Sequence, residues 1–236
     1  GISEQGSASL LAGLDEFRAR TDGEAAVDFA LSSVISGRQP DPMAELPELI
    51  ARGVPTAKAF MVFDFRLPDD RLFAALQVMG RHGGMLQVHC ENATIIDALV
   101  SGALEAGRVE CRHHASCRPT YAEAEATHRA IALARAADAS VYVVHLSCAD
   151  ALAEFVAAKA SGWPVYAETC PHYLSRTDAA YAGDDEAEMI KSVISPPLRS
   201  ESATVRRVPS SSRNRALATS PPFTCSMLSY PWSSTR

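Results

Sequence analysis

The sequence predicts an α/β fold built around a parallel sheet. Short apolar segments typical of buried strands alternate with longer segments of helical periodicity, at intervals of roughly 25 to 35 residues. Repeated strand–helix–strand units of this kind form parallel sheets. No glycine-rich fingerprint follows any strand, and polar residues recur where the strands end, so a (β/α)8 TIM barrel fits better than an open sheet. Only five barrel strands can be counted in the 236 residues, so the predicted barrel is partial.

Residues 7 to 83 contain the first half of this pattern. Apolar residues at helical spacing predict the first helix, and Pro68 followed by two acidic residues is the expected start of a later one. Gly53 ends the helix that precedes the second strand. In chain order we expect a helix at 7–20, a short strand at 25–30, a helix at 43–53, a strand at 54–63 and a helix at 68–83.

Residues 86 to 199 continue the alternation. Two of the strand-like runs contain a single histidine, and the segments between the strands are rich in alanine, the strongest helix former. In chain order we expect a strand at 86–89, a helix at 93–106, a polar loop at 108–120, a helix at 122–137, a strand at 141–147, a helix at 149–161, a strand at 164–169 and a last segment of the pattern at 193–199.

Composition and charge exclude several classes of protein. The chain is 47% hydrophobic and 21% charged, as ordinary soluble globular proteins are, and its length is sufficient for one sizeable core. The net charge of −6 provides no basic surface for nucleic acid or for an anionic membrane. No apolar run approaches the roughly 20 residues that span a bilayer.

The six cysteines could form three disulfides, but several of them follow predicted core strands. That is a poor place for the disulfide framework of a secreted protein, so we expect a reduced, cytoplasmic protein. The sequence begins Gly1-Ile2-Ser3, without a methionine or a signal-peptide pattern. We therefore expect a piece of a longer protein.

The composition changes abruptly at Ser200. Residues 200–236 contain ten serines, four prolines and five arginines, and no acidic residue follows Glu201. We expect two parts, a partial barrel domain at 1–199 and a separate, disordered tail at 200–236. Because the break follows a well-formed segment, a shifted reading frame is the alternative explanation, which sequencing of the source DNA would decide.

Three residues on predicted strands stand out chemically: Lys58, His89 and His145. A lysine inside an apolar strand is costly to desolvate, so it needs a partner, a lowered pKa or a chemical modification. Each histidine stands near the C-terminal end of its strand, where an imidazole nitrogen can bind a metal at the mouth of a barrel. One such histidine is more often a hydrogen-bonded core residue, but three such residues at matching positions predict a metal site.

Six segments of the chain resemble one enzyme family. They are, in order, Ala57-Lys-Ala-Phe-Met61, Val88-His-Cys-Glu-Asn92, Ser116-Cys-Arg-Pro119, Val144-His-Leu-Ser147, Ala167-Glu-Thr-Cys-Pro171 and Ser195-Pro-Pro-Leu-Arg199. Over about residues 7–199 the chain is similar to the dihydropyrimidinase/hydantoinase branch of the cyclic amidohydrolases. The resemblance implies a TIM barrel of the metal-dependent amidohydrolase type. It also implies hydrolysis of the ring amide bond of a cyclic ureide, a dihydropyrimidine or a hydantoin.

The resemblance implies residue roles and cofactors as well. Lys58 corresponds to a lysine whose carbamate bridges two divalent metal ions, usually Zn²⁺, and His89 and His145 correspond to ligands of one of them. The metals activate a bridging water, as hydroxide, for attack on the ring carbonyl. Ser195 corresponds to the residue whose backbone binds the amide edge of the ring. A homotetramer is also implied by the resemblance alone.

Three features depart from the family pattern. No His-x-His pair precedes His82 and no aspartate follows Glu201. We therefore expect barrel strands one, two and eight, with their metal ligands and the acid/base aspartate, to be absent from this chain, and the chain by itself to be inactive. Phe63 stands where many members carry a tyrosine whose hydroxyl steadies the developing oxyanion, and losing such a donor costs on the order of 100-fold in rate. We place Phe63 among the substrate-binding residues.

Other interpretations stay open. Among enzymes, an allantoinase- or dihydroorotase-like hydrolase shares the barrel and its lysine and histidine ligands. Outside enzymes, a non-catalytic dihydropyrimidinase-related protein would keep the barrel for assembly. The segment 111–117 contains two cysteines and two histidines, but their spacing is cramped for a structural zinc. We place Glu123 and Glu125 on a solvated helix face.

Overall fold

The computed structural model describes residues 9–174, 176–177 and 181. Their strands form one parallel sheet whose spatial order follows the chain. The five strands are β1 (Ser33–Val34), β2 (Thr56–Phe60), β3 (Met85–His89), β4 (Val141–Val143) and β5 (Val165–Ala167). The predicted α/β class with a parallel sheet is confirmed. The predicted segment at 193–199 and the tail at 200–236 lie outside the described residues.

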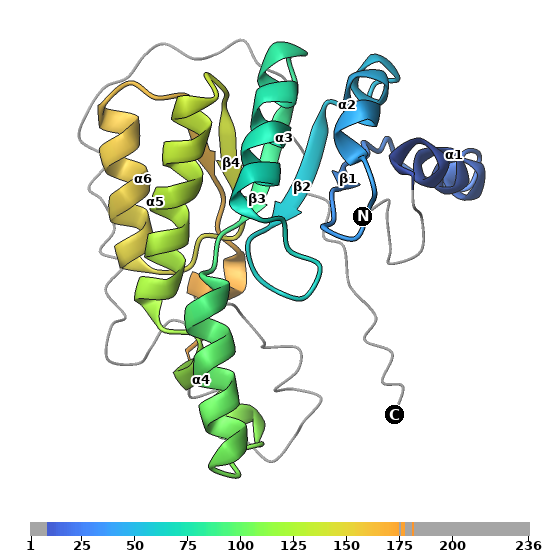
Figure 1. Ribbon diagram of the computed structural model, residues 1–236. Helices are drawn as coiled ribbons and strands as arrows, with labels where there is room; N and C mark the ends of the chain where they lie inside the picture. Colours follow the sequence, from blue (N-terminus) through green and yellow to red (C-terminus); the bar gives the residue numbers. More distant parts are fainter. Residues whose placement is uncertain (1–8, 175, 178–180, 182–236) are drawn as a thin grey trace.

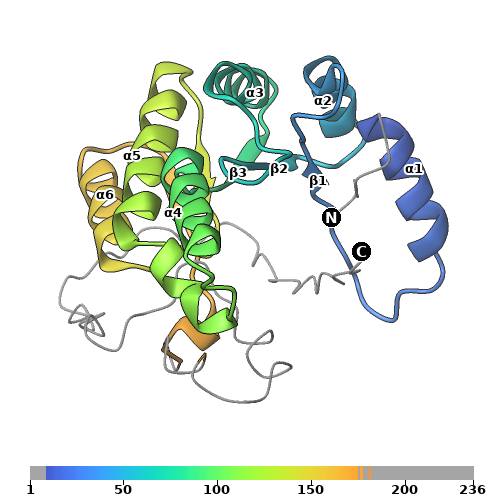
Figure 2. The ribbon, with the colours of Figure 1, turned by 60° about the horizontal axis from the view of Figure 1, so that its bottom comes forward.

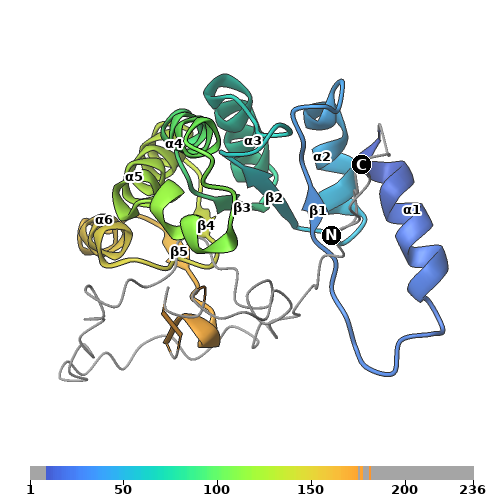
Figure 3. The same ribbon diagram turned by 90° about the horizontal axis from the view of Figure 1, so that it is seen from below.

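The α-helices of the described residues are α1 (Leu10–Thr21), α2 (Pro42–Ala51), α3 (Asp69–Arg81), α4 (Ala93–Glu105), α5 (Thr120–Ala136) and α6 (Ala149–Ala160). Seen from below, α2, α3, α5 and α6 form an arc outside a curved row of strands (Figure 3). α1 packs against α2, and α4 extends past the carboxyl ends of the strands (Figures 1 and 2). None of these helices is long and apolar enough to cross a membrane.

Local sequence explains where most of the helices begin. Ser9, Asp41 and Asn92 precede α1, α2 and α4, and each side-chain oxygen accepts a hydrogen bond from the backbone N–H three residues further on. α3 begins after Pro68 with two acidic residues in its first turn, where their charges favour the helix dipole, as the sequence predicts.

The core lies between the sheet and the helices. Successive side chains of a strand point to opposite faces, and Ala57 and Ala59 in β2 and Leu86 and Val88 in β3 are fully buried in the core cluster. α3 and α5 supply the facing layer.

The other face of the sheet carries several polar side chains. Lys58, Gln87 and Tyr142 are partners in register on β2, β3 and β4, so they share this face. His89 lies two residues beyond Gln87 and belongs to the same row of positions. Lys58 and His89 therefore lie on the face of the sheet that the helices do not cover.

The strand predicted at 25–30 is wrong. These residues are irregular, and the first strand lies further on, at Ser33–Val34. Val27 and Phe29 are 77% and 46% exposed, whereas Val34 is buried. The composition of 25–30 is typical of a strand, but only residues 33 and 34 pair with β2. Long-range pairing, which local composition does not record, decides the position of this strand.

Candidate metal and catalytic site

The three predicted metal ligands come from three adjacent strands. Lys58 lies within β2, and His89 is the last residue of β3. The strand predicted at 141–147 ends earlier, at Val143, so His145 lies in the turn that follows β4. Its φ of 41° is a left-handed conformation that is uncommon for residues other than glycine. Parallel strands end at one edge of the sheet, so His89 and His145 share that edge, and Lys58, two residues before the end of β2, lies on the same face as His89.

The two imidazoles are in direct contact. His89 Nδ1 lies 2.9 Å from His145 Nε2, and the ring centroids are 4.6 Å apart. Burial lowers the pKa of both histidines, that of His145 strongly, and the charge of Lys58 acts in the same direction on each. The rings are therefore neutral at ordinary pH, which is the form that binds a metal.

His89 contacts an ion pair formed by Glu91 and Arg118. Its Nε2 lies 2.7 Å from Glu91 Oε2, and Arg118 Nη1 donates to both carboxylate oxygens of Glu91, at 3.0 and 2.8 Å. Sequence reasoning assigned neither Glu91 nor Arg118 a role, although both lie in the motifs that carry the family resemblance. A signal was available, because Glu91 follows a strand-ending histidine by two residues.

Lys58 is half-buried on the polar face. Its Nζ lies 5.0 Å from the centroid of the Phe60 ring, and no described acidic residue forms a salt bridge with it. Burial lowers the pKa of Lys58, against the opposing influence of Glu168. The neutral amine, the nucleophilic form, is therefore more accessible than in an exposed lysine.

The predicted solvent exposure of Glu123 is wrong. Placed on a solvated helix face by its sequence, it is only 3% exposed, whereas Glu125 is exposed as predicted. Both oxygens of Glu123 accept hydrogen bonds from Ser147, one from the backbone N–H and one from the hydroxyl, each at 2.9 Å. Ser147 lies two residues after His145, so Glu123 holds the turn that presents this histidine. Burial raises the pKa of Glu123 to about 7.

The predicted substrate-binding residues have different outcomes. Phe63 has a φ of 76°, and its ring lies 5.4 Å from that of His89 and 5.8 Å from Cζ of Arg118. The aromatic face thus borders the histidine pair without a hydrogen-bond donor. Ser195 lies outside the described residues.

The donor set fits part of a metal site. The part of the chain that the structure describes contains no group of three or more histidine, cysteine, aspartate or glutamate side chains that could hold a metal ion. It does contain two converging imidazole nitrogens and an amine that becomes an anionic ligand only after modification. The segment 111–117 folds into two 3₁₀ turns, η1 (Cys111–His113) and η2 (Ala115–Cys117), and does not form such a group either.

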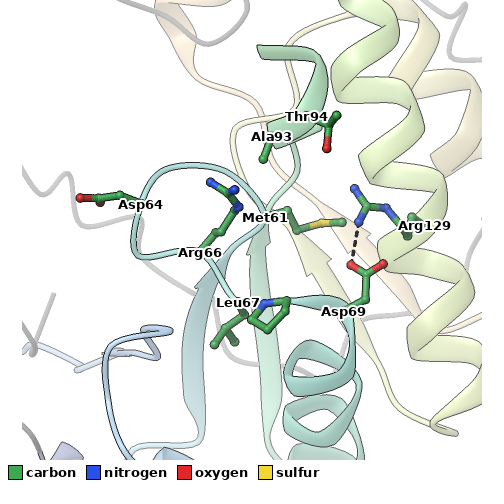
Figure 4. A pocket seen from close by; sticks show the side chains of 9 residues that line it. Met61, Asp64, Arg66, Leu67, Asp69, Ala93, Thr94 and Arg129 are labelled. Atoms are coloured by element: carbon green, nitrogen blue, oxygen red, sulfur yellow. Dashed lines mark hydrogen bonds and ion pairs between the residues drawn. The ribbon is translucent and has the colours of Figure 1, made fainter. Parts of the chain in front are cut away.

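A separate hollow of about 560 Å³ lies between the loop after β2 and the starts of α3 and α4. Figure 4 shows Arg129 reaching across it to Asp69, and the two form an ion pair of 2.6 Å. Neither Lys58 nor the histidine pair lines this hollow. It is therefore distinct from the candidate metal site.

Known proteins match most of the chain. No protein-family model matches. The chain is 39% identical over 193 residues to a D-hydantoinase of Streptomyces coelicolor, and 36% identical over 189 residues to a D-hydantoinase of Geobacillus stearothermophilus. The matches cover 81% and 79% of this chain, but 41% and 40% of the two relatives. The chain thus spans about two fifths of the length of these relatives.

Solved structures agree with the sequence matches. A dihydropyrimidinase from Brevibacillus agri matches with a TM-score of 0.77 at 37% identity, over 84% of this chain and 43% of that one. A D-hydantoinase from a Bacillus species matches with a TM-score of 0.76 at 35% identity, over 84% of this chain and 44% of that one. Over the matched residues, the chain is therefore similar to D-hydantoinases and dihydropyrimidinases.

Proposed function

We propose that the protein to which this chain corresponds opens cyclic ureides, hydantoins or dihydropyrimidines, by hydrolysis of a ring amide bond. The observation that carries the proposal is the contact of 2.9 Å between His89 Nδ1 and His145 Nε2, on neighbouring strands and close to Lys58. The relatives are named hydantoinases and dihydropyrimidinase. These names favour the two substrate classes over the allantoinase-like, dihydroorotase-like and non-catalytic alternatives.

Lys58 is carbamylated in this proposal. The neutral amine attacks the carbon of CO2, a C–N bond forms and one proton leaves, which produces an anionic carbamate with two oxygens. The lowered pKa of Lys58 supports this step because only the unprotonated amine is nucleophilic. The carbamate of Lys58 would supply oxygen ligands for divalent metal ions, and Zn²⁺ is a metal that nitrogen and oxygen ligands suit.

His89 and His145 would hold one of these metals, because His89 Nδ1 and His145 Nε2 face each other. When bound, divalent metals supply an activated water and polarise the ring carbonyl. Phe63 offers the substrate an apolar aromatic face beside His89, and the backbone of Ser195 binds the amide edge of the ring. No residue of this chain is proposed as the acid/base catalyst.

The architecture in this proposal is part of a (β/α)8 barrel. β1 to β5 are five of its eight strands, residues 1–199 are its domain, and strands one, two and eight lie outside this chain. The substrate is a small molecule, and neither nucleic acid nor membrane is a partner. We propose a homotetramer and a cytoplasmic location for the complete protein. The five described cysteines form no disulfide with one another, as thiols in a reducing compartment do not.

Ring-opening assays test the proposal. A complete version of the protein, supplied with zinc and bicarbonate, is expected to hydrolyse hydantoin or dihydrouracil, and His145→Ala is expected to abolish this activity. His128→Ala is the matched control, because His128 is exposed on α5 and its only bonded partner among the described residues is Glu154 on α6. Preference for allantoin or dihydroorotate, or full activity of the His145→Ala variant, would contradict the proposal.

A further inference from the structure

The two ring nitrogens of His89 face different partners. Nδ1 faces His145 Nε2 at 2.9 Å, and Nε2 faces Glu91 Oε2 at 2.7 Å. Phe60 stacks against the imidazole at 5.5 Å and Phe63 lies 5.4 Å from it, so aromatic rings confine the plane of the histidine. Which nitrogen carries the proton is then decided by the polar partners at the ring edge.

Arg118 forms an ion pair with the buried Glu91. Glu91 is 2% exposed, and an isolated carboxylate at this depth would be costly to desolvate. Arg118 Nη1 donates to both of its oxygens, which offsets that cost. The ionised carboxylate can only accept hydrogen bonds.

The proton of His89 must therefore sit on Nε2. If Nδ1 carried it, the lone pair of Nε2 would face the Glu91 carboxylate at 2.7 Å, and two acceptors would meet with no proton between them. With the proton on Nε2, a charge-assisted hydrogen bond forms there, and the lone pair of Nδ1 points toward His145.

We infer that Glu91, held by Arg118, is a positioning residue that sets the Nε2–H tautomer of His89 and thereby presents Nδ1 as the nitrogen for a metal. The inference rests on the proposed function for the metal, but the tautomer itself is a property of the metal-free chain. Carboxylates that orient a ligating histidine in this way commonly contribute about 10- to 100-fold to metal affinity.

The first experiment reads the tautomer directly. The full chain, labelled with ¹⁵N-histidine and free of metal, is measured by long-range ¹H–¹⁵N correlation, with the His89 signals assigned through His89→Gln. We expect a protonated Nε2 and an unprotonated Nδ1 in the wild type, and a mixture of tautomers in Glu91→Gln, because a neutral amide can either donate or accept. A protonated Nδ1 in the wild type would overturn the inference, even if the variant failed to fold.

The second experiment measures zinc affinity by competition with a chromophoric chelator. Glu91→Gln is expected to weaken binding by about 10- to 100-fold. Glu125→Gln, which also removes a carboxylate paired with an arginine but contacts no histidine, should leave affinity unchanged. Equal affinity of Glu91→Gln and wild type would overturn the inference. If the wild type had the expected tautomer but bound no zinc, the result would instead contradict the proposed metal site and the proposed function that depends on it.

Discussion

Burial changes the chemistry of four ionisable side chains around the candidate site. It lowers the pKa of Lys58, His89 and His145 and raises that of Glu123, because the charged form is penalised in every case. For the histidines and the lysine, the favoured neutral forms are those that bind metal and react with CO2. The same physical effect thus prepares all three predicted ligands.

Carbamylation of Lys58 is the first test at this scale. With zinc and ¹³C-bicarbonate, the chain is expected to show a carbamate signal in its ¹³C NMR spectrum that grows as the pH rises, because more amine is then unprotonated. Lys58→Arg should remove the signal, since a guanidinium does not add CO2. Lys159→Arg is the control, because Lys159 donates to Val165 O and lies away from the histidines. A carbamate signal that persists in Lys58→Arg contradicts the assignment.

The raised pKa of Glu123 predicts a pH-dependent stability. Its pKa is about 7 in the folded state against an ordinary 4.5, so the folded state binds more protons between these values. The contribution of Glu123 to the free energy of unfolding is therefore fully present below pH 4.5 and falls as the pH rises to about 7. At about 1.4 kcal/mol per pKa unit, the fall amounts to roughly 3 kcal/mol.

Urea denaturation of wild type and Glu123→Gln at several pH values measures this effect. The unfolding free energy of the wild type, relative to that of Glu123→Gln, is expected to decrease between pH 4.5 and 7 and to stay constant above pH 7. A constant difference across this range would show that Glu123 does not titrate as its burial implies.

At the scale of elements, the loop after β2 depends on a close backbone contact. Gly37 N–H donates to Phe65 O at 2.8 Å, and Arg71 donates to the carbonyl of Gly37 at 3.2 Å. A Cβ on Gly37 would lie only 2.4 Å from the carbonyl oxygen of Arg66, which is backbone and cannot rotate away. The turn after β1 therefore holds the loop that carries Phe63 beside His89.

Gly37→Ala tests this contact. The loop must shift to admit the methyl group, and we expect destabilisation of about 1–3 kcal/mol in chemical denaturation. Gly102→Ala is the matched control: Gly102 lies in α4 with nothing within 4 Å of an added Cβ, so the same substitution should stabilise the helix, by up to about 1 kcal/mol. Equal stability of Gly37→Ala and wild type would contradict the contact.

At the scale of the whole molecule, the sheet presents two edges. In the described residues β1 pairs only with β2, and β5 only with β4. A closed barrel has no such edges. The 236 residues also contain neither a His-x-His pair nor an acidic residue after Glu201. Both facts agree with the proposal that other strands complete the site.

The chain by itself is therefore expected to catalyse no metal-dependent ring opening. The purified 236-residue chain, supplied with zinc and bicarbonate, should leave hydantoin and dihydrouracil unchanged over the buffer rate, because the proposal assigns it the ligands of one metal only. Measured hydrolysis that disappears with a chelator and in His145→Ala would refute this expectation.

The α/β class and most helices, to within a few residues, follow from the residue pattern, which also singles out Lys58, His89 and His145, three side chains that lie near one another in the fold. These features can be predicted because hydrophobic periodicity and helix caps depend on residues that are close together in the sequence. An ionisable residue within an apolar strand is likewise recognised from its immediate neighbours. The fold alone shows that β1 lies at Ser33–Val34 and that Arg118 pairs with Glu91, 27 residues away along the chain, beside His89. Pairings between distant residues depend on register and burial, and neither leaves a mark in the local pattern.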